Sequence, residues 1–265
     1  MSAKLYVFLA FCLITFQGAY GIKPTDAPYV RNPYVDDVTW NALTPYFLPS
    51  NSHERAVLDR IFMKKRALSS FESMEKMGFW VIADVQKQLV VAFHQKLKGY
   101  IIKAYLDTFN VDEAYWFKRR IDGARHIQAS IEAHGFEHIM KVPKKWIYPL
   151  PPGPDPKPGN TRRNFLLICE EMDILSDEKN RNAYQKKASR EILDALYLII
   201  TENLLIDSVY IDNIPFCKDG RIAFIDTEHF LDTTHTLSLE VFLRFISPQM
   251  GEYWQYLMWH GPSEG

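Results

Sequence analysis

The stretch VYIDNIPFCKDGRIAFIDTEH, residues 209–229, decides how the rest of the chain is interpreted. Two short apolar runs, NIPF and RIAFID, are joined by CKDG, and Asp-Gly is a strong signal for a tight turn between antiparallel strands. The pattern predicts a β-hairpin that begins at Asn213 and ends thirteen residues later at Asp226. Because a hairpin returns the chain to its start, both polar side chains are expected at one place.

These two side chains allow two interpretations. Carboxylate and amide oxygens are the ligands that a hard cation such as Mg²⁺ prefers, together with phosphate oxygens and water. Asn and Asp also commonly flank ordinary turns, where backbone N–H groups satisfy them. The hairpin by itself favours the ordinary turn, so the choice depends on the elements around it.

Five further strands are predicted before the hairpin. Residues 78–105 contain three short runs rich in β-branched and aromatic residues, separated by polar VQKQ and KLKG, which predict three antiparallel strands. KKWIYPL and NFLLICEEMD predict two more. The stretch 151–163 between them is too rich in proline for a helix or a central strand, so it is expected to be an exposed loop. The result is a five-stranded sheet that ends near Asp173.

Apolar residues at helical spacing predict helices in four other segments. The segments are 53–65, 112–134, 179–203 and 237–260. Ser52 is expected to cap the first helix, Gly123 to break the second into two pieces, and Gly135 to end it.

Composition sets limits on size and partners. The 265 residues, 47% of them hydrophobic, are enough for one large domain or two small lobes. Lys and Arg number 31 against 32 Asp and Glu, which gives a formal charge of −1. Non-specific binding of nucleic acid needs a basic excess, so nucleic acid is not an expected partner.

The N-terminus predicts secretion. A lysine, an uncharged apolar run and small residues near position 21 are typical of a signal peptide over residues 1–21, and the apolar run is shorter than a bilayer span. We therefore expect a secreted or extracytoplasmic protein with no membrane span after cleavage. Residues 22–52, rich in Pro, Tyr and Asn, are expected to form an extended arm. Cys169 and Cys217 lie in apolar runs and are expected to be buried thiols rather than a disulfide.

The order of these elements resembles the protein-kinase-like fold. Lys103 in GYIIKAY matches the strand lysine of that family, LICEEMD looks like the segment that joins its lobes, and Asn213 and Asp226 match its two metal ligands. The resemblance implies an α+β, two-lobed protein with a five-stranded antiparallel N-lobe sheet and a short, mainly helical C-lobe. The lobes are expected at 53–173 and 174–265.

The resemblance also implies roles for individual residues. Lys103 would hold the phosphates of ATP, Asn213 and Asp226 would hold Mg²⁺, and Asp207 would orient the acceptor hydroxyl. In this family a helix glutamate pairs with the strand lysine. Glu113 and Glu132 are the candidates for that partner, and a surface carboxylate is the alternative for each.

Three departures from the family pattern leave two functions open. FWVIADVQKQLVVAF has no glycine between its strands to approach phosphate, and H-R-D is absent, because a strict count back from Asn213 reaches Ser208 rather than Asp207. Only 39 residues follow Asp226, and D-F-G is replaced by Asp-Thr-Glu, in which Glu228 is either a third metal ligand or a surface charge. The chain is either a Mg-nucleotide-dependent phosphotransferase for a small, unknown acceptor or a pseudokinase that binds a partner. A secreted structural domain is a third alternative.

Other groups of residues are weaker candidates for a functional site. His134 and His138 are four residues apart, as zinc ligands on a helix are, but Gly135 lies between them and no third ligand is evident. Three arginines, Arg119, Arg120 and Arg125, predict a basic patch that is more often a solvated helix face than an anion site. Aromatic residues at 254–259 are expected in the core, with a partner-binding patch as the alternative.

Overall fold

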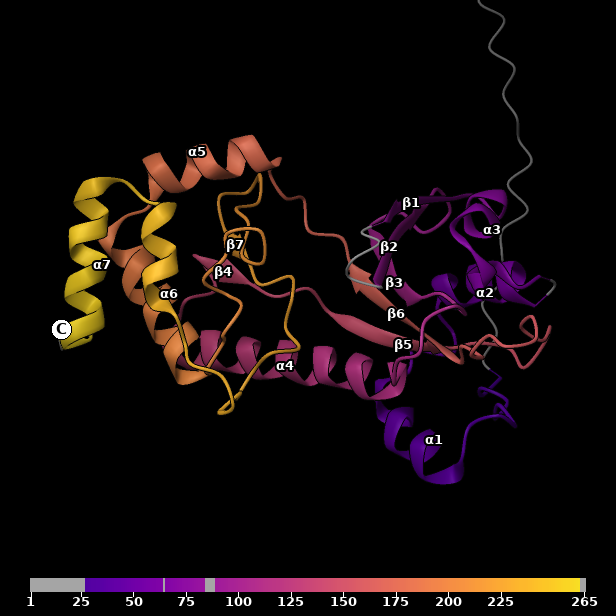
Figure 1. Cartoon of the computed structure of the whole chain (residues 1–265). Coiled ribbons are helices and arrows are strands. Elements are labelled where there is room, and N and C mark those ends of the chain that lie inside the picture. The colour runs from indigo at the N-terminus through magenta and orange to yellow at the C-terminus, as the bar shows by residue number, and fades with distance from the viewer. Residues whose placement is uncertain (1–26, 64, 84–88, 263–265) are drawn as a thin grey trace, which may run out of the picture.

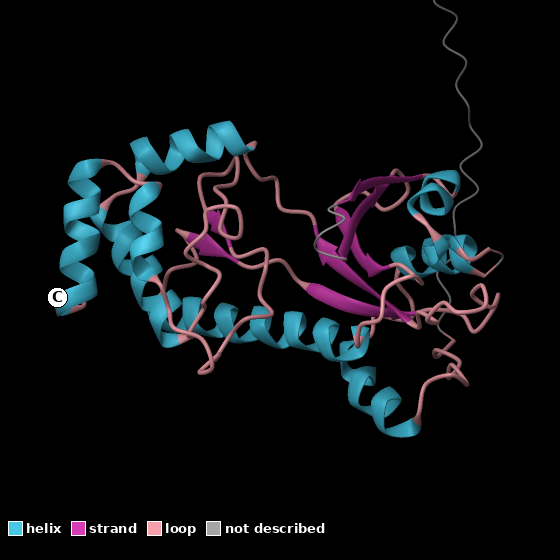
Figure 2. Cartoon of the chain, in the orientation of Figure 1, coloured by secondary structure: helices cyan, strands magenta, loops and turns pink. Residues whose placement is uncertain are grey.

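The computed structural model describes residues 27–63, 65–83 and 89–262. The predicted signal peptide and the VQKQ segment lie outside these residues. The larger sheet and several short helices lie at one end of the described chain, and the remaining helices lie with a pair of short strands at the other (Figure 2). A single long helix, α4 (Glu113–His134), runs alongside both parts (Figure 1).

The five-stranded antiparallel sheet is confirmed, and with it the α+β class. Its strands follow the order β1-β2-β3-β6-β5, and every neighbouring pair is antiparallel. The strands are β1 (Phe79–Ala83), β2 (Leu89–His94), β3 (Tyr100–Tyr105), β5 (Lys145–Pro149) and β6 (Phe165–Glu170). Residues 151–163 form the expected loop between β5 and β6.

Each face of the sheet has its own apolar core. Helices α2 (His53–Phe62) and α3 (Phe71–Lys76) supply buried side chains to one face. The other face packs against Phe117 and Ile121 of α4. Ser52 caps α2 as predicted, by accepting a hydrogen bond from the backbone N–H of Arg55.

The N-terminal segment is not wholly extended, so that prediction is wrong for part of its length. It contains α1 (Asp37–Leu43) and the 3₁₀ turn η1 (Thr44–Tyr46). Asp36 caps α1 through the N–H of Thr39, and Trp40 and Leu43, three residues apart, are buried in the same core as α4. A cap and two apolar residues on one face are sufficient for this short helix, despite the surrounding prolines.

Helix α4 is continuous through Gly123, so the predicted break is wrong. A Cβ atom added at Gly123 would lie 1.8 Å from the carbonyl oxygen of Thr227. The glycine therefore allows another segment of backbone to touch the helix, and the 22-residue helix tolerates its low helix propensity. Gly135, with φ of 71°, ends α4 as predicted.

The helical end of the molecule has its own core, called here the helical core, to which α4 contributes Ile127 and Ile131. The other elements there are α5 (Asp177–Lys187), α6 (Arg190–Glu202), η3 (Leu239–Arg244), α7 (Pro248–His260), β4 (Met140–Lys141) and β7 (Ile222–Ala223). Trp254 and Leu257 of α7 are buried in this core, whereas Trp259 is 82% exposed.

Two predicted helices are each divided in the structure. Residues 179–203 form α5 and α6 rather than one helix, because Ser189 begins a new helix by accepting from the N–H of Ile192. Residues 237–260 form η3 and α7, and Ser247 caps α7 through the N–H of Met250. Serine favours a helix start over a helix interior, which explains both breaks.

The predicted hairpin is present as a hydrogen-bonded return of the chain. The N–H of Ala223 donates to Pro215 O, and the N–H of Ile225 donates to Asn213 O at 3.0 Å. Gly220, with φ of 91°, supplies the turn. The regular strand in it is limited to β7, which pairs in parallel with β4. Cys169 and Cys217 are buried free thiols, as expected.

No helix within the described residues has the length and apolarity that crossing a bilayer requires.

Gly123→Ala is expected to destabilise the protein by about 3 kcal/mol, because the added methyl group must displace the backbone at Thr227 rather than a flexible side chain. Urea denaturation of the purified chain measures the change.

Gly251→Ala is the matched control, since Gly251 also lies in a helix and its added Cβ would meet only Leu243 Cδ2 at 3.7 Å. That variant is expected to gain roughly 0.5 kcal/mol from helix propensity. Equal stabilities for the two variants would contradict the proposed close contact at Gly123.

Candidate functional site

Lys103 lies in the middle of the sheet and reaches the hairpin. It is 8% exposed on β3, directly opposite Leu167 of β6, on the sheet face that packs against α4. Its Nζ lies 3.1 Å from Asp226 Oδ1. Lys103 and Asp226 therefore meet between the sheet and the end of the hairpin, although 123 positions separate them in the sequence.

Arg120 of α4 is a second cation at Asp226. Its guanidinium donates to Asp226 Oδ1 and forms an ion pair with Glu228 Oε1. The side chain is only 7% exposed, so the expected solvated position is wrong for Arg120. Its neighbour Arg119 is half-buried and donates to the carbonyl oxygens of Glu228 and Phe230. The buried position of the Arg120 side chain depends on contacts with residues distant in the sequence, so no local sequence pattern predicts it.

Lys145 is a third cation beside this site, which the sequence did not single out. Its Nζ donates to Thr227 Oγ1 at 2.5 Å and to Ile225 O at 3.3 Å, on either side of Asp226. Burial lowers the pKa of the Lys145 ammonium to about 8. The feature of the sequence that could have identified Lys145 is a lysine at the start of a strand that is otherwise expected to be buried.

The two carboxyl groups respond differently to this environment. Burial alone would raise the pKa of Asp226, but Lys103 and Arg120 outweigh it and hold that pKa well below its usual range. Burial raises the pKa of Glu228, and the adjacent Asp226 charge adds to this effect, against the opposing influence of Arg120. With both carboxylates ionised, the three cations leave the cluster with a formal charge of +1.

Asn213 and Asp207 lie together at the start of the hairpin. Asn213 Nδ2 donates to the carbonyl oxygen of Asp207 at 3.0 Å, and the carbonyl of Asn213 accepts from the N–H that precedes Asp226. The Asp207 side chain is 42% exposed, and its Oδ2 lies 3.6 Å from His229 Nε2. The hairpin thus connects the Asn213–Asp207 pair to the Lys103–Asp226 pair through one backbone hydrogen bond.

A buried nitrogen of the cluster, Arg120 Nε, has no hydrogen-bond partner within the described residues, and neither has a buried oxygen, Glu228 Oε2. It belongs to a carboxyl group that shares Arg120 with Asp226, so two oxygen ligands of the type that Mg²⁺ prefers face the same place. The donor set fits a hard cation, although the net positive charge of the cluster opposes a bare divalent ion.

No group of three or more His, Cys, Asp and Glu side chains forms a metal site within the described part of the chain. His134 Nε2 contacts Glu202 at 2.8 Å, whereas His138 Nε2 contacts Glu191 at 3.3 Å. The two histidines therefore face different carboxylates and do not share one site.

The two candidate glutamates are placed away from Lys103. Glu132 is exposed and accepts from Gln128 Nε2 at 2.8 Å. Glu113, at the start of α4, accepts from the backbone N–H groups of Asn164 and Phe165 and lies 3.7 Å from Arg163. On α4, the residue that reaches the cluster is a base, Arg120.

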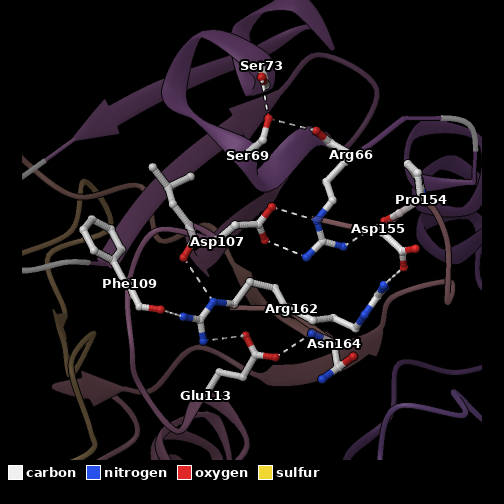
Figure 3. Close-up of polar contacts among 12 residues, drawn as sticks. Arg66, Ser69, Ser73, Asp107, Phe109, Glu113, Pro154, Asp155, Arg162 and Asn164 are labelled. Carbon is white, nitrogen blue, oxygen red and sulfur yellow. Dashed lines mark hydrogen bonds and ion pairs between the residues drawn. The ribbon is translucent and has the colours of Figure 1, made fainter. Parts of the chain in front are cut away.

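A buried ionic network fixes the loop that carries the chain from β3 into α4 (Figure 3). Arg66 makes two hydrogen bonds to the fully buried Asp107, of 2.7 and 2.6 Å. Arg163 donates to three carbonyl oxygens of the same loop, those of Leu106, Phe109 and Val111. This network holds the start of α4, and hence the register at which Arg120 meets Asp226.

No family model matches the chain, and no curated protein matches it.

Glu113 is expected to make the stability of the protein depend on pH. Burial raises its pKa from 4.5 to about 7, so the folded state binds this proton more tightly than the unfolded state. The resulting stabilisation is complete below about pH 4.5 and is lost as the pH rises through 7. The wild type should therefore lose on the order of 2 kcal/mol, relative to Glu113→Gln, between pH 5 and pH 8.

Urea denaturation of both proteins at a series of pH values measures this difference. Glu132→Gln, an exposed change on the same helix, serves as the control and should leave the pH dependence unchanged. Parallel curves for wild type and Glu113→Gln would rule out a raised pKa at Glu113.

Proposed function

We propose that the chain has a two-lobed protein-kinase-like fold and transfers a phosphoryl group from a Mg-nucleotide to a small acceptor. The observation that carries the proposal is the 3.1 Å contact between Lys103 Nζ and Asp226 Oδ1, which joins the strand lysine to the end of the hairpin. The antiparallel sheet followed by α4, and the hairpin that starts at Asn213, support the same assignment.

The proposal gives each residue a role. Lys103 holds nucleotide phosphates, Asn213 and Asp226 hold Mg²⁺ with Glu228 as a further oxygen ligand, and Asp207 orients the acceptor hydroxyl. When bound, the metal ion neutralises charge on the phosphate oxygens. The partly exposed carboxylate of Asp207 is suited to its role because an acceptor must reach it from solvent.

The charge of the cluster determines what it binds. A bare Mg²⁺ would raise the formal charge from +1 to +3, which the buried surroundings oppose. Mg-ATP carries a net negative charge and brings its own phosphate oxygens as ligands. The metal and the nucleotide are therefore expected to bind together rather than in sequence.

A pseudokinase is the second candidate, and Arg120 favours it. Its permanently charged guanidinium already bonds to Asp226, the carboxylate that the metal needs. The absence of glycine in FWVIADVQKQLVVAF and of H-R-D before Asn213 agrees with lost transfer. In that case the chain binds a nucleotide, a partner protein or both without chemistry. Secretion, expected from residues 1–21, applies equally to both candidates.

Mg-ATP is expected to stabilise the wild-type protein against heat, because a ligand that binds only the folded state raises its stability. At a hundredfold excess over Kd the melting temperature should rise by roughly 5 to 10 °C. Lys103→Met and Asp226→Asn should each abolish the shift measured against their own unliganded melting temperature. MgCl₂ alone should have no effect.

Lys96→Met is the control, since Lys96 is an exposed lysine in the turn after β2, and it should retain the full shift. A wild type that shows no shift with Mg-ATP would refute nucleotide binding, and with it the proposed function.

Asp207→Asn distinguishes the two candidates. The substitution removes a carboxylate at a 42%-exposed position, so nucleotide binding should be retained. For a phosphotransferase, the transfer of γ-³²P-phosphate to small hydroxyl acceptors, or to water, should fall by about 10²-fold or more. Wild-type protein that binds Mg-ATP and transfers no phosphate would instead identify a pseudokinase.

A further inference from the structure

A cavity of about 500 Å³ lies on the flank of α4, next to the site, with which it shares only Lys145 among its lining residues. One wall is a stripe of helix residues at helical spacing, and the opposite wall is the segment 142–146, which leads from β4 into β5. The helix residues are Ile121, Ala124, Arg125, Gln128, Ala129 and Glu132. Small-molecule sites in proteins commonly have this volume.

The lining combines an apolar body with a basic bias. The apolar part of the lining comes from Ile121 and the two alanines of the helix and from Val142 and Pro143 of the opposite wall, and the small alanine side chains leave the space open. Of the four charged residues in the lining, three are basic, namely Arg125, Lys144 and Lys145, and one is acidic.

Because of the position of the acidic residue, Glu132, the two ends of the cavity differ in charge. Glu132 lies seven residues after Arg125 on the same helix, which separates them by about 10 Å along its axis. A negatively charged group is therefore favoured at the Arg125 end and opposed at the Glu132 end. Arg125 is held at this end, because its guanidinium stacks over the Tyr46 ring at 4.5 Å.

We propose that this cavity binds a small amphipathic anion, an aromatic carboxylate whose ring packs on Val142 and Pro143 and whose carboxylate pairs with Arg125 and Lys144. The apolar floor excludes a bare inorganic anion, which would bury no surface there. The basic bias excludes a cationic ligand.

Lys145 connects this cavity to the candidate site. Its side chain forms part of the cavity wall, and its Nζ holds Thr227 Oγ1 and Ile225 O beside Asp226. A carboxylate in the cavity attracts the same ammonium group and weakens its hold on Thr227. Ligand binding is thus coupled to the placement of Asp226, and the effect of that coupling on nucleotide binding rests on the proposed function.

Isothermal titration of the full chain with 2-naphthoate tests the site. We expect one binding site with a Kd between roughly 20 µM and 1 mM, as is usual for a ligand of this size. Ala129→Trp should fill the cavity and abolish binding, and Lys144→Glu should weaken it at least tenfold. Ala133→Trp, an exposed change on α4 outside the cavity, should bind as the wild type does.

Three results would overturn the assignment. The first is that 2-naphthoate does not bind the wild type. The second is that Ala129→Trp and Lys144→Glu both bind it as the wild type does. The third is that the wild type binds 2-naphthylmethylammonium, which has the opposite charge, with equal affinity.

The coupling is tested by repeating the titration with saturating Mg-ATP. In the wild type, we expect Mg-ATP to change the Kd of 2-naphthoate at least threefold. In Lys145→Met, Mg-ATP should leave this Kd unchanged. A wild-type Kd that is the same with and without Mg-ATP would refute the coupling. If Mg-ATP does not bind, the coupling fails together with the proposed function, and the titration without nucleotide still decides whether the cavity is an anion site.

Discussion

Helix α4 and residues 225–228 cross at Gly123, where the carbonyl oxygen of Thr227 lies within 1.8 Å of the point that a Cβ atom would occupy. Thr227 is held at this crossing by two hydrogen bonds, from its Oγ1 to Arg120 O and from Lys145 Nζ to its Oγ1. Because Arg120 precedes Gly123 by less than one helical turn, the crossing sets its guanidinium against the carboxylates on either side of Thr227. The geometry of the charge cluster therefore depends on this contact between the two backbones.

Within that cluster the charges are arranged differently from those implied by the kinase resemblance. There, a helix acid pairs with the strand lysine. Here the helix contributes a base, Arg120, and the second acid is Glu228, two residues after Asp226. The exchange keeps the buried charges paired, as burial requires. It also gives Asp226 two basic partners, Lys103 and Arg120, so a metal ion must compete with them for the carboxylate.

Local patterns predicted most of the sheet, because β-branched runs and prolines act over a few residues. The Ser52 cap, the Gly135 helix end and the turn at Gly220 were predicted for the same reason. Two of the errors arose where a contact distant in sequence overrides a local signal, whereas the helix starts at Asp36, Ser189 and Ser247 were local signals that were missed. Gly123 was expected to break a helix and instead admits Thr227, and Arg120 was expected in solvent and instead pairs with residues more than 100 positions away. No short window of sequence contains either partner.

Helix α4 also has a thermodynamic consequence for the molecule as a whole. Its first half completes the core beneath the sheet through Phe117 and Ile121, and its second half completes the helical core through Ile127 and Ile131. If either core melted, the shared helix would lose half of the packing that keeps it wound, and fraying would spread along it to the other. The two ends should therefore denature as one cooperative unit, without a half-melted intermediate.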